Sequence, residues 1–230
     1  MKKFYTDVNL EKKDDGYLIL LDGKSIKTPL KKDMLCPTEK LAQAIVEEWG
    51  SQGDIINPRD MPMMQLLNTA IDRVADQRKK VEAEFIAHLG NDTIIYRAEQ
   101  SDELTALEEK LWQPLYGWVK ETFDEDTQTT KNILGHVDNK GLKKKIEHWM
   151  AGLDDYHLTA LLEAGSLTSS IIIGSALCHG DITAEQAFDA AYLEENYQAQ
   201  KWAPDEQAAE NRAQALNNLK QLELFLAYLN

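Results

Sequence analysis

Two adjacent acidic residues near the C-terminus, Glu194 and Glu195, are the first residues with a possible chemical role. They lie in segment 183–202, where apolar residues recur with the helical period of about 3.6 residues, so the segment predicts a single amphipathic helix. The predicted apolar stripe consists of Ala184, Phe188, Ala191, Tyr192, Ala199 and Trp202. Glu195 falls in the middle of this stripe, Gln198 lies at its edge, and Glu194 points elsewhere.

The position of Glu195 suggests a binding role, because an ionised carboxylate on a buried face is unfavourable unless it is paired. Its partner is expected to be a cation or a hydrogen-bond donor, in this chain or in another protein. A purely structural alternative is a bond within the chain, for example to Arg97 or to a backbone amide. A catalytic alternative uses Glu195 or Asp72 as a general base and Arg97 as an anion clamp. It requires these groups to converge in a deep pocket with a raised carboxylate pKa.

The ends of this helix are marked by local signals. Thr183 is expected to cap the first turn, and Gln186, three residues later, to complete a capping box. Pro204 is expected to stop the helix, because it disfavours helical geometry at the residue before it.

Other sets of reactive residues are weak candidates for catalysis. Cys178 and His179 are adjacent, so on a helix their side chains diverge and neither can activate the other. The histidines and the two cysteines show no metal-ligand spacing, and neither GxxxxGK[ST] nor GxGxxG occurs. The sequence therefore predicts no catalytic set, no metal site, no cofactor and no small-molecule substrate.

The charge of the chain limits its partners and its location. A formal net charge of −14 argues against nucleic acid, because phosphate binding rests on clustered lysine and arginine. The N-terminus lacks the apolar region of a signal peptide, and the least charged run, residues 164–178, is too short to insert into a membrane. We expect a cytoplasmic protein, or one in the matrix of an organelle.

The pattern of apolar and polar residues along the chain predicts an α+β protein with two domains. The first 37 residues have the pattern of a β-meander, with Asp22-Gly23 as a two-residue hairpin turn. Thr38 then caps a helix, and the predicted domain boundary lies near residue 60. Residues 1–60 would form a small β-rich domain and residues 61–230 a larger all-helical domain.

Two of the predicted helices bear on packing. Apolar residues between 62 and 90 trace one face of a long helix without an internal proline. In segment 166–178 small residues recur every four positions, which would let another helix approach closely and would make this the central buried helix. A final helix is expected after Asp205, with Leu216, Leu219, Leu222 and Leu226 facing inward.

Several short motifs, in order from residue 4 to about residue 205, carry a resemblance to a known family. They are Phe4-Tyr-x-Asp7, Leu21-Asp-Gly-Lys24, Lys27-Thr-Pro29, Glu48-Trp49, Pro58-Arg-Asp-Met-Pro62, Leu67-Asn-Thr-Ala-Ile-Asp72, Tyr96-Arg97, Trp112-x-Pro-Leu115, Leu193-Glu-Glu-Asn-Tyr-Gln198, Trp202 and Asp205. The chain resembles the Atp12-type assembly chaperones of the F1 sector of ATP synthase, found in mitochondria and α-proteobacteria.

This resemblance implies a β-rich N-terminal domain, a helical C-terminal domain and an activity without catalysis. The expected partner is the free α subunit of F1, bound before it pairs with β. An acidic residue of the segment that corresponds to Leu193-Glu-Glu-Asn-Tyr-Gln198 matters in the family, and here it is Glu194 or Glu195. We therefore expect Glu195, Glu194, Gln198 and Trp202 to bind the partner, with Arg97 and Asp72 as supporting residues. The location would be the bacterial cytoplasm, or the mitochondrial matrix for a mature eukaryotic chain.

Overall fold

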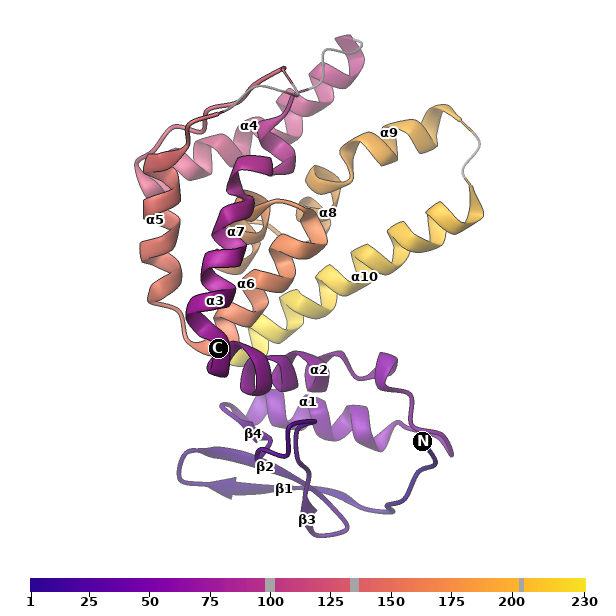
Figure 1. Ribbon diagram of the computed structural model, residues 1–230. Coiled ribbons are helices and arrows are strands. Elements are labelled where there is room, and N and C mark those ends of the chain that lie inside the picture. Colours follow the sequence, from indigo (N-terminus) through magenta and orange to yellow (C-terminus); the bar gives the residue numbers. More distant parts are fainter. Residues whose placement is uncertain (98–101, 133–136, 203–204) are drawn as a thin grey trace. The chain divides into compact units, whose positions relative to one another are not determined.

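The computed structural model describes residues 1–97, 102–132, 137–202 and 205–230 of the 230-residue chain (Figure 1). Its contacts form two compact units. The first unit comprises Met1–Arg78, Asp154–Ala160 and Leu224–Asn230, and the second comprises Lys79–Leu153 and Leu161–Glu223. The predicted α+β class is confirmed, because a small antiparallel sheet near the N-terminus is followed by a mainly helical chain. The domain boundary near residue 60 stays a prediction.

The sheet of the first unit is organised around its second strand. Its strands are β1 (Val8–Lys13), β2 (Gly16–Leu21), β3 (Lys24–Ser25) and β4 (Leu35–Cys36). The strand β2 pairs antiparallel with β1, and also with β3 and β4. The hairpin turn predicted between β2 and β3 is confirmed, since Asp22 and Gly23 have φ angles of 48° and 77°.

The helix α1 (Glu39–Gly50) follows the sheet and begins where the sequence predicts. The hydroxyl of Thr38 accepts a hydrogen bond from the Leu41 amide at 3.2 Å, which confirms the cap. The next helix, α2 (Pro62–Thr69), has no side-chain cap from the residue that precedes it. Glu48 supplies that cap from α1, since its carboxylate accepts hydrogen bonds from the Met63 and Met64 amides at 2.6 and 2.9 Å.

The single helix predicted for residues 62–90 is wrong. After α2 and a 3-10 turn that precedes it (Pro58–Asp60), the chain forms a π-helical turn at Ala70–Val74 and then α3 (Ala75–Ala87). Gln77 has the non-helical angles φ −124° and ψ 22°. The π turn coincides with a tertiary contact, because Asp72 accepts hydrogen bonds from the Thr28 hydroxyl at 2.7 Å and the Leu30 amide at 2.9 Å. Two 3-10 turns, His88–Asn91 and Thr93–Ile95, follow α3.

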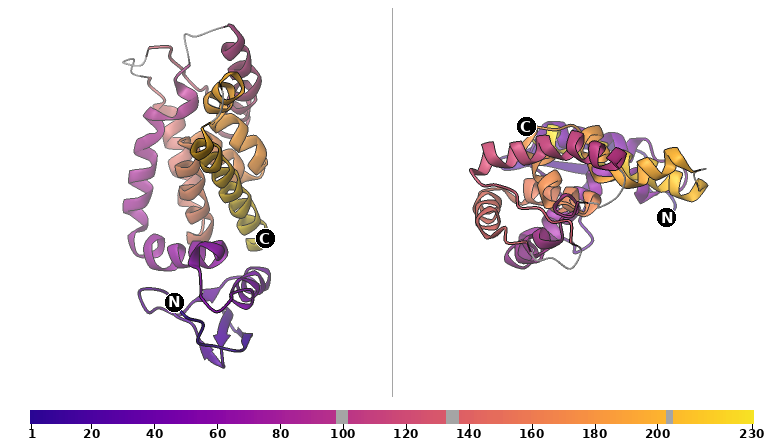
Figure 2. Two further views of the ribbon diagram at one scale, coloured as in Figure 1. Left: turned by 90° about the vertical axis from the view of Figure 1, so that its right-hand side faces the viewer. Right: turned by 90° about the horizontal axis from the view of Figure 1, so that it is seen from above.

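The second unit is built mainly from helices. They are α4 (Asp102–Phe123), α5 (Lys140–Ala151), α6 (Asp155–Thr168), α7 (Ile171–His179), α8 (Ala184–Ala191), α9 (Leu193–Lys201) and α10 (Glu206–Leu229), with the ends of α6 and α10 belonging to the first unit. Residues 171–177 of α7 are all buried, and α7 packs against α4 and α8. Figures 1 and 2 show α4 running across α5 at a steep angle. Of the four leucines predicted to face inward from α10, Leu219, Leu222 and Leu226 are buried, whereas Leu216 is only half-buried.

The small residues of segment 166–178 produce a close helix contact, but not within one helix. The chain breaks at Ser169, whose φ is 49°, and Ser170 caps α7 by accepting a hydrogen bond from the Ile173 amide at 3.0 Å. The predicted close approach is present, since a Cβ atom added to Gly174 would lie 2.7 Å from the Gly165 nitrogen. The prediction of close packing is therefore confirmed, whereas that of a continuous helix is wrong.

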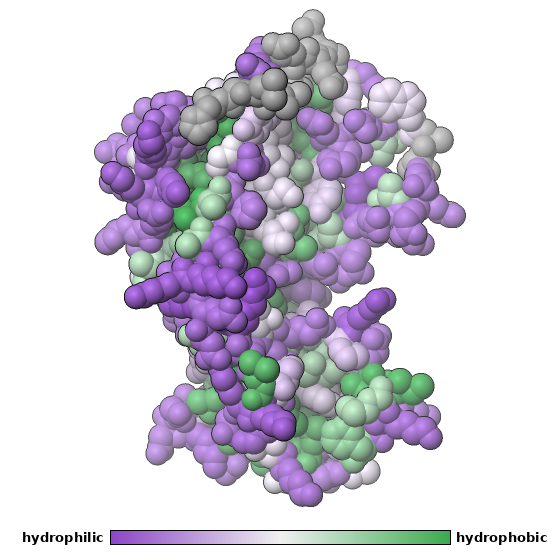
Figure 3. All heavy atoms as spheres, in the orientation of Figure 1, coloured by the Kyte–Doolittle hydropathy of each residue, from purple (hydrophilic) through white to green (hydrophobic). Residues whose placement is uncertain are grey.

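Hydrophilic side chains cover most of the second unit on the face shown in Figure 3. Exposed large apolar side chains of the first unit include Met1, Phe4, Leu30 and Ile55. In the part of the chain that the structure describes, no helix combines the length and the hydropathy that a membrane span requires.

Candidate partner-binding site

The segment that contains Glu194 and Glu195 is two helices and not one. The helix α8 begins with the predicted capping box, in which Thr183 and Gln186 exchange hydrogen bonds of 3.3 and 2.8 Å. It ends at Ala191, because Tyr192 has the non-helical angles φ −103° and ψ 25°. The helix α9 then runs to Lys201, and the predicted stop at Pro204 lies outside the described residues.

The buried face of α8 also differs from the predicted stripe. Its buried residues are Ala184, Ala187 and Ala190, followed by Leu193 at the start of α9. Alanine side chains let α8 lie close to α4 and α7, while the larger rings of Phe188 and Tyr192 are half-buried and stack with centroids 4.8 Å apart. Trp202, predicted on the buried stripe, is 65% exposed.

The carboxylate of Glu195 is exposed, so the prediction that it occupies a buried seam is wrong. The break at Tyr192 changes the helical phase of every later residue and turns Glu195 away from the buried alanines. Glu194 and Gln198 are exposed as well. Within the described ranges, neither Glu194 nor Glu195 makes a hydrogen bond or an ion pair, and the suggested bond between Glu195 and Arg97 is not formed.

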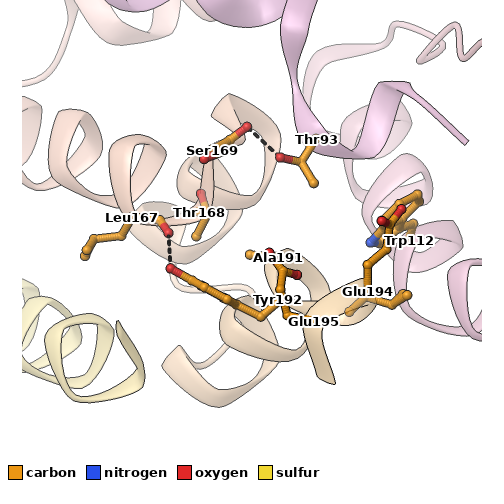
Figure 4. A pocket seen from close by; sticks show the side chains of 10 residues that line it. Thr93, Trp112, Leu167, Thr168, Ser169, Ala191, Tyr192, Glu194 and Glu195 are labelled. Carbon is orange, nitrogen blue, oxygen red and sulfur yellow. Dashed lines mark hydrogen bonds between the residues drawn. The ribbon is translucent and has the colours of Figure 1, made fainter. Parts of the chain in front are cut away.

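A cavity of about 370 Å³ brings Glu194 and Glu195 together with residues from distant parts of the second unit (Figure 4). Its walls come from four segments, which contribute Thr93, Trp112, residues 167–169 and residues 191–195. Figure 4 shows Trp112 and Tyr192 on opposite sides of the cavity, with Glu194 on the side of Trp112. The cavity thus lies where the two breaks in the helices meet, one at Ser169 and the other at Tyr192.

Long-range hydrogen bonds hold these walls together. The hydroxyl of Tyr192 donates to the Leu167 carbonyl at 3.1 Å, and the indole of Trp112 donates to the Ala190 carbonyl at 2.9 Å. Both carbonyl groups belong to the last turn of a helix, where no intrahelical amide remains to bind them. The Thr93 hydroxyl donates to the Ser169 carbonyl at 2.9 Å. These side chains therefore stabilise the interrupted helices and fix the shape of the cavity.

The buried carboxylate of Asp92 positions one of the segments that line the cavity, the turn that contains Thr93. It accepts hydrogen bonds from the Ile94 amide at 3.2 Å and from the Ile172 amide at 3.0 Å, and so ties the 3-10 turn at Thr93–Ile95 to the start of α7. Burial raises the pKa of Asp92 to about 6, against the opposing effect of these hydrogen bonds. The sequence analysis missed Asp92, because its tertiary partner Ile172 lies 80 residues further along the chain.

The predicted supporting residues lie elsewhere. Arg97 has a side chain only 16% exposed and is engaged by Glu108 at 3.3 Å and by Glu109 at 3.0 Å. Asp72 belongs to the first unit and is bonded to Thr28 and Leu30, as described above. Neither Arg97 nor Asp72 lines the cavity, so the convergence required by the catalytic alternative is not observed among the described residues.

The electrostatics of the cavity favour a positively charged ligand. Burial raises the pKa of Glu194, and the negative charges of Glu108 and Glu195 add to the shift. A bound cation would relieve this repulsion. No cluster of three histidine, cysteine or acidic side chains suited to a metal ion occurs in the described part of the chain.

Comparisons with known proteins agree on one family. The family model for the ATP12 chaperone protein matches residues 2–120. The mitochondrial protein atp12 of Schizosaccharomyces pombe is 28% identical over 235 aligned positions, which cover 94% of this chain and 79% of that protein.

Two solved structures are also similar over the full chain. The crystal structure of Atp12 from Paracoccus denitrificans has a TM-score of 0.93 and 31% identity, covering 100% of this chain and 98% of that one. A putative chaperone from Agrobacterium tumefaciens has a TM-score of 0.92 and 31% identity, covering 100% and 86%. On these grounds the chain belongs to the ATP12 chaperone protein family.

Proposed function

We propose that this chaperone binds the free α subunit of the F1 sector of ATP synthase and shields its subunit interface until a β subunit pairs with it. The resemblance of the sequence motifs to the Atp12-type assembly chaperones supports this partner. Exposed apolar surface of interface size promotes aggregation, so covering it is a task that needs no reaction, cofactor or small-molecule substrate. The protein would act in the bacterial cytoplasm or, for a eukaryotic chain, in the mitochondrial matrix.

The observation that carries the proposal is the cavity with the carboxylates of Glu194 and Glu195, for which the described part of the chain shows no hydrogen-bond or ion-pair partner. Gln198, on the same helix, is exposed, and Trp202 follows the last residue of that helix. An exposed tryptophan is suited to an interface, because aromatic anchors contribute a large share of binding energy. We assign partner binding to Glu194, Glu195, Gln198 and Trp202. Arg97 and Asp72 are assigned structural support through the contacts described above.

The experiment is retention of purified α subunit by the tagged chaperone, with β subunit as the specificity control. Wild-type protein should retain α and not β. Glu195→Gln should retain less α, whereas Asp189→Asn, which removes one exposed charge from α8 outside the cavity, should match the wild type. Failure of the wild type to retain α would contradict the assigned partner. Equal retention by a folded Glu195→Gln variant would remove the role given to that side chain.

A further inference from the structure

We propose that the cavity lined by Trp112, Glu194 and Glu195 receives an arginine side chain of the protein partner. This inference rests on the proposed function, since it names the chemical group by which the partner is recognised at the same site.

The hydrogen-bonding capacity of the cavity wall points to a ligand rich in donors. The hydroxyl groups of Thr93, Thr168 and Tyr192 direct their hydrogens to backbone carbonyls at 2.9, 2.7 and 3.1 Å. The indole N–H of Trp112 is used in the same way. What these side chains still offer is acceptor oxygens, and Glu194 and Glu195 add four more. The hydroxyl of Ser169 is the one side-chain donor of the described lining without such a bond. A guanidinium group has five N–H donors and no acceptor, which complements this wall.

The negative charges of Glu194 and Glu195 also favour a ligand with a positive charge. Arg97, the cation that the sequence suggested as a partner for Glu195, is already engaged by Glu108 and Glu109. Glu194 and Glu195 therefore have no cation of their own within the described ranges, although each lies close enough to influence its neighbours electrostatically. A guest that carries a positive charge would supply what the chain itself does not provide.

Two features favour arginine over lysine. The planar guanidinium holds its N–H groups in a fork that can reach two carboxylates, here Glu194 and Glu195, at the same time. An ammonium group is a compact point charge with three donors and would leave more of the acceptors unbound. The volume of about 370 Å³ also exceeds the space of a single ammonium and lies in the usual range for small-ligand sites, roughly 300–1,000 Å³.

The first test uses a small probe and needs no partner protein. N-acetyl-arginine amide is titrated into the folded chaperone while the indole N–H signals of the five tryptophans are followed by NMR. The Trp112 signal should shift in a saturable manner. N-acetyl-citrulline amide, which has nearly the same shape without the charge, and N-acetyl-lysine amide should bind at least about tenfold more weakly. Equal binding of the citrulline probe, or no saturable shift with the arginine probe, would overturn the assignment.

Variants locate the effect. The double variant Glu194→Gln/Glu195→Gln replaces exposed side chains by isosteres, so its fold should persist, and it should lose at least about tenfold in affinity for the arginine probe. The Asp189→Asn variant should bind the probe as the wild type does. An unchanged affinity in the double variant would refute the role of the two carboxylates.

The second test separates this inference from the proposed function. If the wild type retains α subunit and the double variant retains it equally, the arginine site is refuted while the proposed partner stands. If the arginine probe binds at Trp112 but α is not retained by the wild type, the site stands and the proposed partner fails. If the wild type binds both the α subunit and the arginine probe, and the double variant binds neither, the proposed function and the arginine site are both supported.

Discussion

The close contact between Gly165 and Gly174 predicts that alanine at position 174 destabilises the protein, whereas alanine at Gly117, in the same unit, stabilises it. In Gly174→Ala the new Cβ atom would lie 2.7 Å from the Gly165 nitrogen, 3.0 Å from its Cα and 3.1 Å from the Ala164 carbonyl carbon. All three atoms belong to the backbone of α6, so no side-chain rotation can relieve the contact. Reaching an ordinary separation of about 3.5 Å requires α7 and α6 to part by roughly 0.8 Å.

The expected change follows from two opposing contributions. Overpacking a buried contact costs about 1–3 kcal/mol, and backbone contact places this site at the upper end. Alanine in a helix interior regains up to about 1 kcal/mol relative to glycine. We therefore expect Gly174→Ala to lower the free energy of unfolding by about 2 kcal/mol.

The matched control is Gly117→Ala in α4, where an added Cβ atom meets nothing within 4 Å. There only the helix propensity changes, so the variant should be more stable by about 0.5–1 kcal/mol. Urea unfolding followed by far-ultraviolet circular dichroism measures both variants against the wild type. If Gly174→Ala unfolds at the same urea concentration as Gly117→Ala, the inference of close backbone contact between α6 and α7 is incorrect.

Three further substitutions test other parts of the structure. Burial raises the pKa of the Glu48 side chain to about 7, from about 4.5 in the unfolded chain. The stabilisation that comes from its protonated form is therefore complete below about pH 4.5 and is lost as the pH rises through 7. The wild type should therefore lose stability relative to Glu48→Gln across this window, and parallel unfolding curves from pH 4 to 8 would contradict the assignment. Asp92→Ala leaves two buried backbone amides without an acceptor and should lower the free energy of unfolding by about 3 kcal/mol, measured by urea unfolding at pH 7. Trp202→Ala should change stability by less than about 0.5 kcal/mol, because the ring is 65% exposed, yet reduce retention of α subunit; a large loss of stability would show that the ring is packed.

Features with short-range causes were predictable from the sequence. The turn at Asp22-Gly23, the caps at Thr38 and Thr183, and the close approach at Gly174 each depend on residues within a few positions or on the absence of a side chain. The α+β class followed from the same patterns. Each of these local preferences agrees with the final fold, as expected for a natural sequence.

The breaks at Ser169 and Tyr192 were not predictable, because neither position carries glycine or proline. The break at Tyr192 is stabilised by the bond from its hydroxyl to Leu167, 25 residues away, and by the bond from Trp112 to Ala190, 78 residues away. A helical wheel assumes regular geometry and gives weight to large apolar residues. It therefore placed Phe188 inward, whereas close packing buried the alanines of α8.

The position of the two acidic residues follows from the same break. In a continuous helix Glu195 would face the packed side of the unit and would need a partner within the chain. The interruption turns Glu194 and Glu195 outward to a cavity whose remaining hydroxyl and indole groups are mostly committed to carbonyls at or beside helix ends. The residues that stabilise the break thereby leave the cavity short of donors and positive charge. A partner that supplies both is favoured by the local fold itself, independently of where the rest of its surface makes contact.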